Sequence, residues 1–174
     1  MDTRNMNEYH PTDSEIKQAI ELIYYEIKQL IDSTYLFQEA KEAKNKNAFI
    51  ESELVHVRIL IDFFENEKRR WDDILVSDYG FHPKNIDISD SDRTRLNKDL
   101  AHLTYSRLSR SQEDKNWNPN IVVLPILIRA STFIKFLLNE YLDPKNPWFF
   151  QFKRLQDDIN KIIKVNTPDE LSES

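Results

Sequence analysis

Apolar residues recur along most of the chain at the three- and four-residue intervals of an amphipathic α-helix. The first such stretch follows a capping box, in which Thr12 is the expected N-cap and Glu15 the reciprocal N3 acceptor. The helix is expected to continue to about Ala43. Its seam keeps a strict four-three spacing over Ile16, Ile20, Ile23, Ile27, Leu30, Thr34 and Phe37. Such a seam favours packing against antiparallel neighbouring helices.

A second helix is predicted near Asn47 to Glu67, and it is apolar over most of its circumference. A helix of that kind belongs in the middle of a fold, because it has no wide polar face to leave in water. Glu53 and His56 are the exceptions on its buried side. Buried polar groups must find hydrogen-bond partners, so we expect these two side chains to form a buried hydrogen-bonded pair.

The helical periodicity stops between residues 67 and 89, where Gly80, Pro83 and a run of aspartates occur. We expect a long excursion there, with a short helical turn near residues 72–78. Five apolar side chains should hold it against the bundle: Trp71, Ile74, Leu75, Tyr79 and Phe81. Long loops in compact domains are often functional, so a lid is one interpretation of this segment.

Two further helices are expected after the excursion. The first covers residues 91–110 and is capped by Ser89 or Ser91. The second runs over residues 121–142, with Pro125 either in its first turn or at a kink.

The last helix is expected after Asn146–Pro147, a favourable N-cap and N1 pair. Together the patterns predict an all-α protein, an up-and-down bundle of about five main helices in a single domain over residues 12–165. Residues 1–11 are expected to be flexible, and residues 166–174 to form a disordered acidic tail. We expect no apolar run near the roughly 18 residues of a membrane span, and therefore a soluble cytoplasmic protein with no membrane partner.

Composition excludes several classes of protein. The 174-residue chain has one glycine and no cysteine. Phosphate-binding loops and Rossmann units use glycines at tight turns, so those classes are excluded. The lack of cysteine excludes disulfides and thiolate metal sites. The formal net charge of −6 argues against a broad electrostatic grip on nucleic acid but leaves room for a small basic cleft.

The expected helix over residues 91–110 separates into two faces when its positions are placed about 100° apart. One face carries leucines such as Leu96 and Leu100. The opposite face carries a polar row made of Arg95, Asp99, His102, Ser106 and Ser109. Arg95 and His102 are seven residues apart, so their side chains can reach a common object across two turns. A permanent cation beside a titratable imidazole favours an anionic object.

Residues 95–102 (RLNKDLAH) resemble the R-x(4–6)-H motif of the HEPN superfamily. The longer string over residues 97–105 and the preceding helix over residues 47–64 resemble the abortive-infection branch of that superfamily. The resemblance implies a metal-independent endoribonuclease without a cofactor, acting as a toxin or phage-defence effector on RNA. It also implies a homodimer in which two protomers pool their motifs in one cleft, with an antitoxin or other protein as a candidate partner.

Carried over residue by residue, the resemblance makes Arg95 and His102 the catalytic candidates. Supporting positions in the same stretch are Asp99, Asn97 and Tyr105, and substrate-binding candidates are Lys98, Ser106 and Arg110. Glu53 and His56 are secondary candidates.

The chemistry of RNA cleavage fits these residue types. Attack by the RNA's own 2′-hydroxyl needs a base for that proton, an acid for the 5′-oxygen and positive charge for the phosphorane. His102 can act as base or acid, and Arg95 can hold phosphate oxygens through its bidentate fork. Because each chain offers one such histidine, a dimer that brings two His102 rings together would supply both acid and base.

Three other interpretations are open. The polar row can be a solvated helix face with an ion pair between Arg95 and Asp99. The bundle can be a non-catalytic module that binds a protein or a nucleotide. Glu53 with His56, and Asp99 with His102, also share the carboxylate-x-x-His spacing of di-iron bundles. Those sites need further inward-facing glutamates, and none stands out in the first helix, so no metal site is predicted.

Overall fold

We describe residues 9–98 and 118–166 of the chain in a computed structural model of the protein. Within those two ranges the regular structure is helical throughout. The long elements are α1 (Asp13–Glu39), α2 (Ala43–Glu65), α3 (Asp90–Lys98), α5 (Asn120–Phe136) and α6 (Pro147–Asn166). Two short elements, the 3₁₀ turn η1 (Val76–Tyr79) and the π-helical turn η3 (Leu137–Tyr141), complete the set. The prediction of an all-α helical bundle is confirmed.

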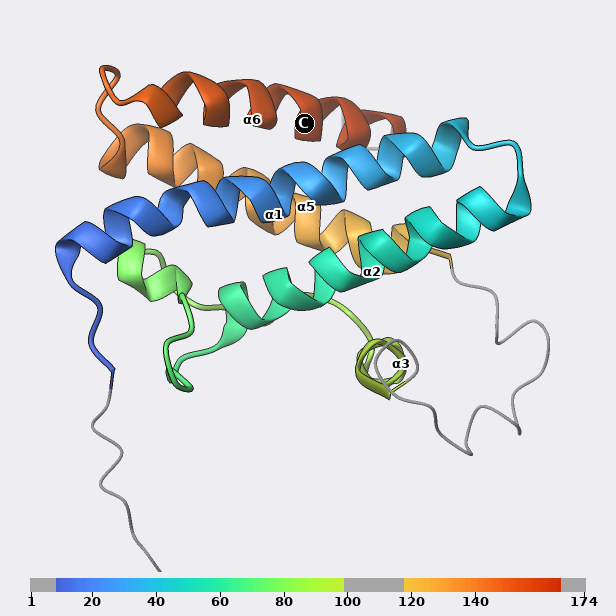
Figure 1. Ribbon diagram of the computed structural model, residues 1–174, viewed down its shortest axis with the longest axis horizontal. Helices are drawn as coiled ribbons and strands as arrows, with labels where there is room; N and C mark the ends of the chain where they lie inside the picture. Colours follow the sequence, from blue (N-terminus) through green and yellow to red (C-terminus); the bar gives the residue numbers. More distant parts are fainter. Residues whose placement is uncertain (1–8, 99–117, 167–174) are drawn as a thin grey trace, which may run out of the picture.

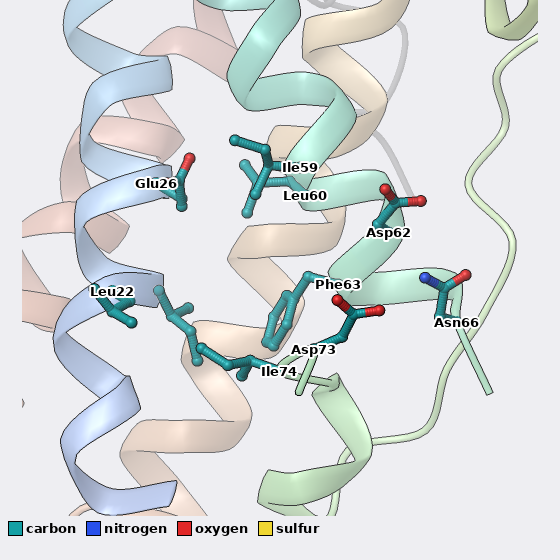
Figure 2. A pocket seen from close by; sticks show the side chains of 10 residues that line it. Leu22, Glu26, Ile59, Leu60, Asp62, Phe63, Asn66, Asp73 and Ile74 are labelled. Carbon is teal, nitrogen blue, oxygen red and sulfur yellow. The ribbon is translucent and has the colours of Figure 1, made fainter. Parts of the chain in front are cut away.

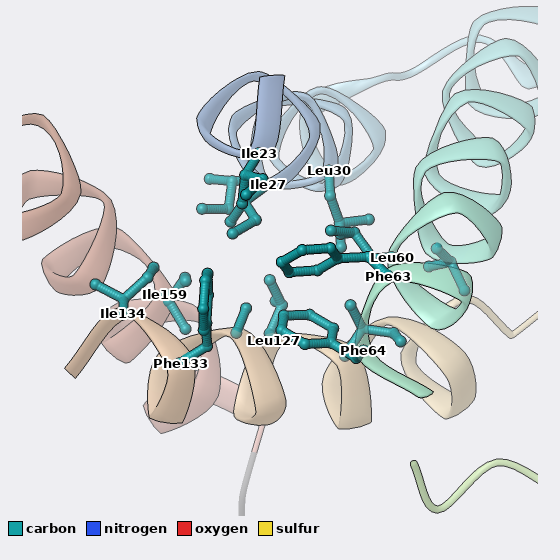
Figure 3. Close-up of a cluster of buried hydrophobic side chains, with 14 of the residues drawn as sticks. Ile23, Ile27, Leu30, Leu60, Phe63, Phe64, Leu127, Phe133, Ile134 and Ile159 are labelled. Carbon is teal, nitrogen blue, oxygen red and sulfur yellow. The ribbon is translucent and has the colours of Figure 1, made fainter. Parts of the chain in front are cut away.

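Four of these helices enclose the core. The helices α1 and α2 form one antiparallel pair, and α5 and α6 form a second pair against it, with α1 on α6 and α2 on α5 (Figure 1). Seen end-on, their apolar side chains converge on a common interior (Figure 3). The short α3 packs against α2 and runs across the direction of the long helices (Figure 1).

Phe133 of α5 is buried in the core and packs against four other aromatic rings. Its ring centroid lies 5.4 Å from that of Phe63, 5.7 Å from Phe64, 6.1 Å from Tyr79 and 5.4 Å from Phe81, in each case edge to face. Such pairs add to the free energy gained by burial alone. This aromatic cluster therefore ties the end of α2 and the segment after it to the centre of the bundle.

The first helix begins as its sequence indicates. The Thr12 amide donates to Glu15 Oε2 at 2.7 Å and the Glu15 amide to Thr12 Oγ1 at 3.3 Å, which is the predicted capping box. Tyr9 extends this cap, because its hydroxyl donates to Glu15 Oε1 at 2.8 Å. Residue 9 is thus tied down within the segment expected to be flexible. The helix ends at Glu39, earlier than expected.

The predicted caps of two later helices are also confirmed. The Asp92 amide donates to Ser89 Oγ at 3.1 Å, so Ser89 rather than Ser91 caps α3. The Trp148 amide donates to Asn146 Oδ1 at 2.9 Å at the start of α6. That helix runs to Asn166, while the expectations for residues 1–8 and 167–174 lie outside the described residues.

The excursion after α2 is held by most of the expected anchors. Leu75 and Tyr79 are buried, and Ile74 and Phe81 are partly buried against the core. The prediction for Trp71 is wrong, because its side chain is 75% exposed and its backbone adopts a left-handed turn with φ of 59°. Tyr79 and Phe81, by contrast, both pack against Phe133 as expected anchors.

The expectation that no apolar run approaches a membrane span is wrong for α5 and η3. By length and composition, the 22 residues Asn120–Tyr141 could cross a membrane, with a mean hydropathy of 2.1. Half of that stretch is buried inside the bundle, between α2 and α6. The apolar run is explained by its place as the central helix. Pro125 lies inside the helix rather than in its first turn.

Truncating Phe133 to alanine should lower the free energy of unfolding by about 3–5 kcal/mol, because it empties the centre of the aromatic cluster. Chemical denaturation followed by circular dichroism measures this. Phe150→Ala, at an exposed position of α6, is the matched control and should cost no more than about 0.5 kcal/mol. Equal losses in the two variants would contradict the central place of Phe133.

Candidate functional site

The helix α3, which carries Arg95, is fixed by its neighbour Arg93. The Arg93 guanidinium forms two 2.8 Å hydrogen bonds with the carboxylate of Glu65 at the end of α2. It also donates to the Ile86 and Ile88 carbonyls at 2.6 and 3.1 Å. Donating these hydrogen bonds to Glu65 raises the pKa of Arg93 above its ordinary value. This bidentate pair ties the first turn of α3 to the end of α2.

Leu96 and Arg95 lie on different sides of α3. Leu96 is 1% exposed and belongs to the core. The Arg95 side chain is 18% exposed, and its Nη1 lies 3.8 Å from Asp92 Oδ1, also 18% exposed. The predicted separation of apolar and polar sides thus holds at these positions, but Arg95 is more covered than a solvated face would leave it. Partial desolvation strengthens any charge interaction that its guanidinium makes.

Two other predicted site residues lie on the described part of α3. Asn97 and Lys98 are exposed in its last turn, where Lys98 also complements the helix dipole. The remaining predicted site residues lie outside the described residues: Asp99, His102, Tyr105, Ser106 and Arg110. The joint arrangement of Arg95 and His102 stays a prediction.

The prediction that Glu53 and His56 bond to each other is wrong. His56 Nδ1 lies 2.7 Å from Glu26 Oε2 of α1, and both side chains are largely covered. The Tyr25 ring packs edge-on to the imidazole, with 6.2 Å between centroids. His56 therefore links α1 to α2, a partner choice set by the register between two helices rather than by spacing within one.

Glu53 is fully buried, and neither of its carboxyl oxygens has a hydrogen-bond partner among the described residues. The nearby Thr34 hydroxyl donates to the Leu30 carbonyl at 2.9 Å. Burial raises the pKa of Glu53 to about 7, against a smaller lowering effect of Thr34. A buried carboxyl without a hydrogen-bond partner has a lower free energy as the neutral acid than as the carboxylate.

Within residues 9–98 and 118–166, no three His, Asp or Glu side chains are grouped so as to hold a metal ion. Glu53 and His56, the described half of the di-iron spacing, have separate surroundings, since His56 pairs with Glu26.

A cleft that sequence reasoning missed opens between α1 and α2, and we call it the α1–α2 cleft. It has a volume of about 390 Å³ and an apolar floor that includes Ile23, Phe63 and Ile74. Carboxylates stand around it, from Glu26 on α1, Asp62 on α2 and Asp73 on the following segment (Figure 2). The sequence does carry a sign of this apolar surface, because Leu22 and Tyr25 are apolar but lie outside the buried seam of α1.

Comparison with other proteins adds no assignment: no protein-family model, curated protein or solved structure matches this chain. The resemblance to the HEPN superfamily rests on the sequence strings alone.

Replacing Glu53 by glutamine should change how stability depends on pH. In the unfolded chain the Glu53 carboxyl ionises near its ordinary pKa of 4.5, whereas in the folded protein it stays neutral to about pH 7. Stability of the native protein therefore falls as pH rises from 4.5 to 7, and Glu53→Gln removes that fall. The stability of the variant relative to the native protein should rise over that window by on the order of 2–3 kcal/mol.

Urea unfolding at a series of pH values measures the effect. Glu51→Gln, at an exposed position of the same helix, is the matched control. The assignment fails if both variants follow the native pH profile.

Proposed function

We propose that this protein is a HEPN-like, metal-independent endoribonuclease that acts as a homodimer, in phage defence or in a toxin–antitoxin pair. The observation that carries the proposal is the fixed placement of Arg95 on α3, away from buried Leu96 and partly desolvated. A guanidinium held in this way is pre-organised to bind a phosphate group. The sequence adds His102 two turns further on, and the all-α bundle is the architecture that the resemblance implies.

The proposed reaction is attack of an RNA 2′-hydroxyl on the adjacent phosphorus, with departure of the 5′-oxygen. His102 of one protomer takes the 2′-hydroxyl proton, and His102 of the partner protomer protonates the leaving oxygen. Arg95 holds the non-bridging phosphate oxygens as their charge grows. Lys98, exposed one turn beyond Arg95, adds positive charge for the neighbouring phosphate.

The second candidate function is a non-catalytic module that binds a protein or a nucleotide. The pairing of Arg95 with Asp92, with both side chains only 18% exposed, favours it. An arginine paired with an acid of its own helix can serve to stabilise α3 without contacting substrate. The two candidates differ in what the loss of Arg95 removes, which is cleavage in the first case and stability alone in the second.

His102→Ala should lower RNA cleavage by the purified protein about 10²-fold or more, because the reaction loses its proton-transfer group. Arg95→Ala should lower cleavage by a similar factor, because the phosphorane loses its counter-charge. Cleavage of a fluorescent RNA in excess EDTA measures both effects and tests metal independence. Arg154→Ala, at an exposed position of α6, is the matched control and should cleave as the native protein does.

Growth of cells on induced expression separates the two candidates. A ribonuclease should arrest growth, with the arrest relieved by either active-site change and kept by Arg154→Ala. RNA that stays intact with the native protein, together with an Arg95→Ala variant that is merely less stable, would overturn the nuclease in favour of the binding module.

A further inference from the structure

The α1–α2 cleft continues into an apolar surface on the outside of the helix pair. Four side chains around it are large, apolar and 41–56% exposed: Leu22 and Tyr25 on α1, and Val55 and Ile59 on α2. Leu22 and Ile59 line the cleft itself (Figure 2). Tyr25 packs against His56, which lies next to Val55 in the sequence. The opposite side of the pair is covered by α5 and α6. Contiguous exposed apolar surface of this kind marks an interaction site.

The surface has the length and shape that a helix needs. The span from Val55 of α2 to its C-cap residue Asn66 covers about three helical turns. A groove between two antiparallel helices accepts the side-chain ridge of a third helix. The floor residues Phe63 and Ile74 lie at one end of this groove, where an anchoring side chain can enter.

The charge around the cleft has one sign. The ten residues that line it include three carboxylates, Glu26, Asp62 and Asp73, and no lysine or arginine. Glu26 is hydrogen-bonded to His56. Burial is the main cause that raises the pKa of Asp62, and Asp73 raises it further, while Arg58 and Arg70 lower it. The lining of the cleft itself therefore offers carboxylates and no cation beside its apolar floor, while Arg58 and Arg70 lie outside the lining and act on Asp62 from there.

We propose that the α1–α2 cleft is a docking site for a basic amphipathic helix of another protein. The apolar side of that helix would fill the cleft and cover the four exposed apolar residues, and its lysine or arginine side chains would meet Asp62 and Asp73. This is helix-in-groove recognition, with anchors at i, i+4 and i+7. The site lies on residues separate from Arg95 and goes beyond the proposed nuclease activity.

The carboxylates of the cleft favour a basic helix over the other possible occupants, which are a second copy of this chain, a nucleic acid and an acidic lipid surface. A second copy of the chain, docked through the same face, would bring its own Glu26, Asp62 and Asp73 against the first set. Like charges opposed across an interface repel each other and suppress such pairing. An anionic nucleic acid or acidic lipid surface meets the same repulsion.

A display library tests the proposal. Its members are helices of about 16 residues with apolar anchors at i, i+4 and i+7, and with the flanking positions drawn equally from lysine and glutamate. Selection on the full-length protein should enrich lysine at the flanks. The affinity of synthesised winners, measured by titration calorimetry, should fall with added salt.

Substitutions locate the binding. Leu22→Ser and Ile59→Ser should each weaken the lysine-rich peptides roughly tenfold or more, because they remove apolar contact area at exposed positions that the fold does not need. Asp62→Asn and Asp73→Asn should weaken lysine-rich peptides and flatten the salt dependence. Leu36→Ser, a 45% exposed leucine elsewhere on α1, is the matched control and should bind as the native protein does.

Three results would overturn the proposal. One is a library that yields no peptides or glutamate-rich ones. Another is a set of winners that bind Ile59→Ser as well as Leu36→Ser, with both variants folded by circular dichroism. The third is a native protein that self-associates in sedimentation while Ile59→Ser stays monomeric, which would assign the cleft to a second copy. None of these results depends on whether the protein cleaves RNA.

Discussion

The contact of Phe133 with four other rings is the constraint on which the rest of the structure depends. Phe63 and Phe64 bring the last turns of α2 to α5, and Tyr79 and Phe81 bring the following segment to the same ring. The position of that segment then decides where α3 can begin. Phe63 also forms part of the floor of the α1–α2 cleft. One side chain of the central helix therefore positions both surfaces on which the functional arguments rest.

Electrostatics completes what apolar packing begins. Leu96 is the one residue of α3 that is fully buried within its described span, so hydrophobic contact alone gives the helix a weak hold. The bidentate contact between Arg93 and Glu65 supplies the orientation, and the Ile86 amide adds a 2.6 Å hydrogen bond to the same carboxylate. Arg95 follows Arg93 by about 200° around the helix, so a tightly paired Arg93 turns Arg95 away from the core. The placement of the proposed phosphate-binding group is in this sense a consequence of Glu65.

The helical fold was predictable because its signals are local. Capping by Thr12, Ser89 and Asn146 depends on residues two or three positions apart, and the structure has each of these caps. Pairings across the fold were not predictable in this way. His56 binds Glu26, thirty positions earlier, because of how two helices align, and Trp71 is exposed in a left-handed turn that its apolar character does not predict. Half of the proposed site, His102 included, lies beyond the described residues and rests on the sequence.

The last turns of α2 contribute carboxylates to two surfaces, one near α3 and one at the α1–α2 cleft, and the two surfaces differ in the charge that they present to a ligand. The carboxylate of Glu65 is paired with the Arg93 guanidinium, so the two charges largely cancel for a ligand that approaches α3. Asp62, one turn earlier, lines the cleft with Asp73 and has no such bidentate partner among the described residues, although Arg58 and Arg70 lower its pKa. A net charge of −6 is therefore no guide to what either surface binds. The surroundings of each carboxylate decide that, because a carboxylate in a bidentate pair with arginine presents little net charge to a ligand, whereas a carboxylate that lines an apolar cleft can meet a ligand's cation at contact distance, where salt screens least.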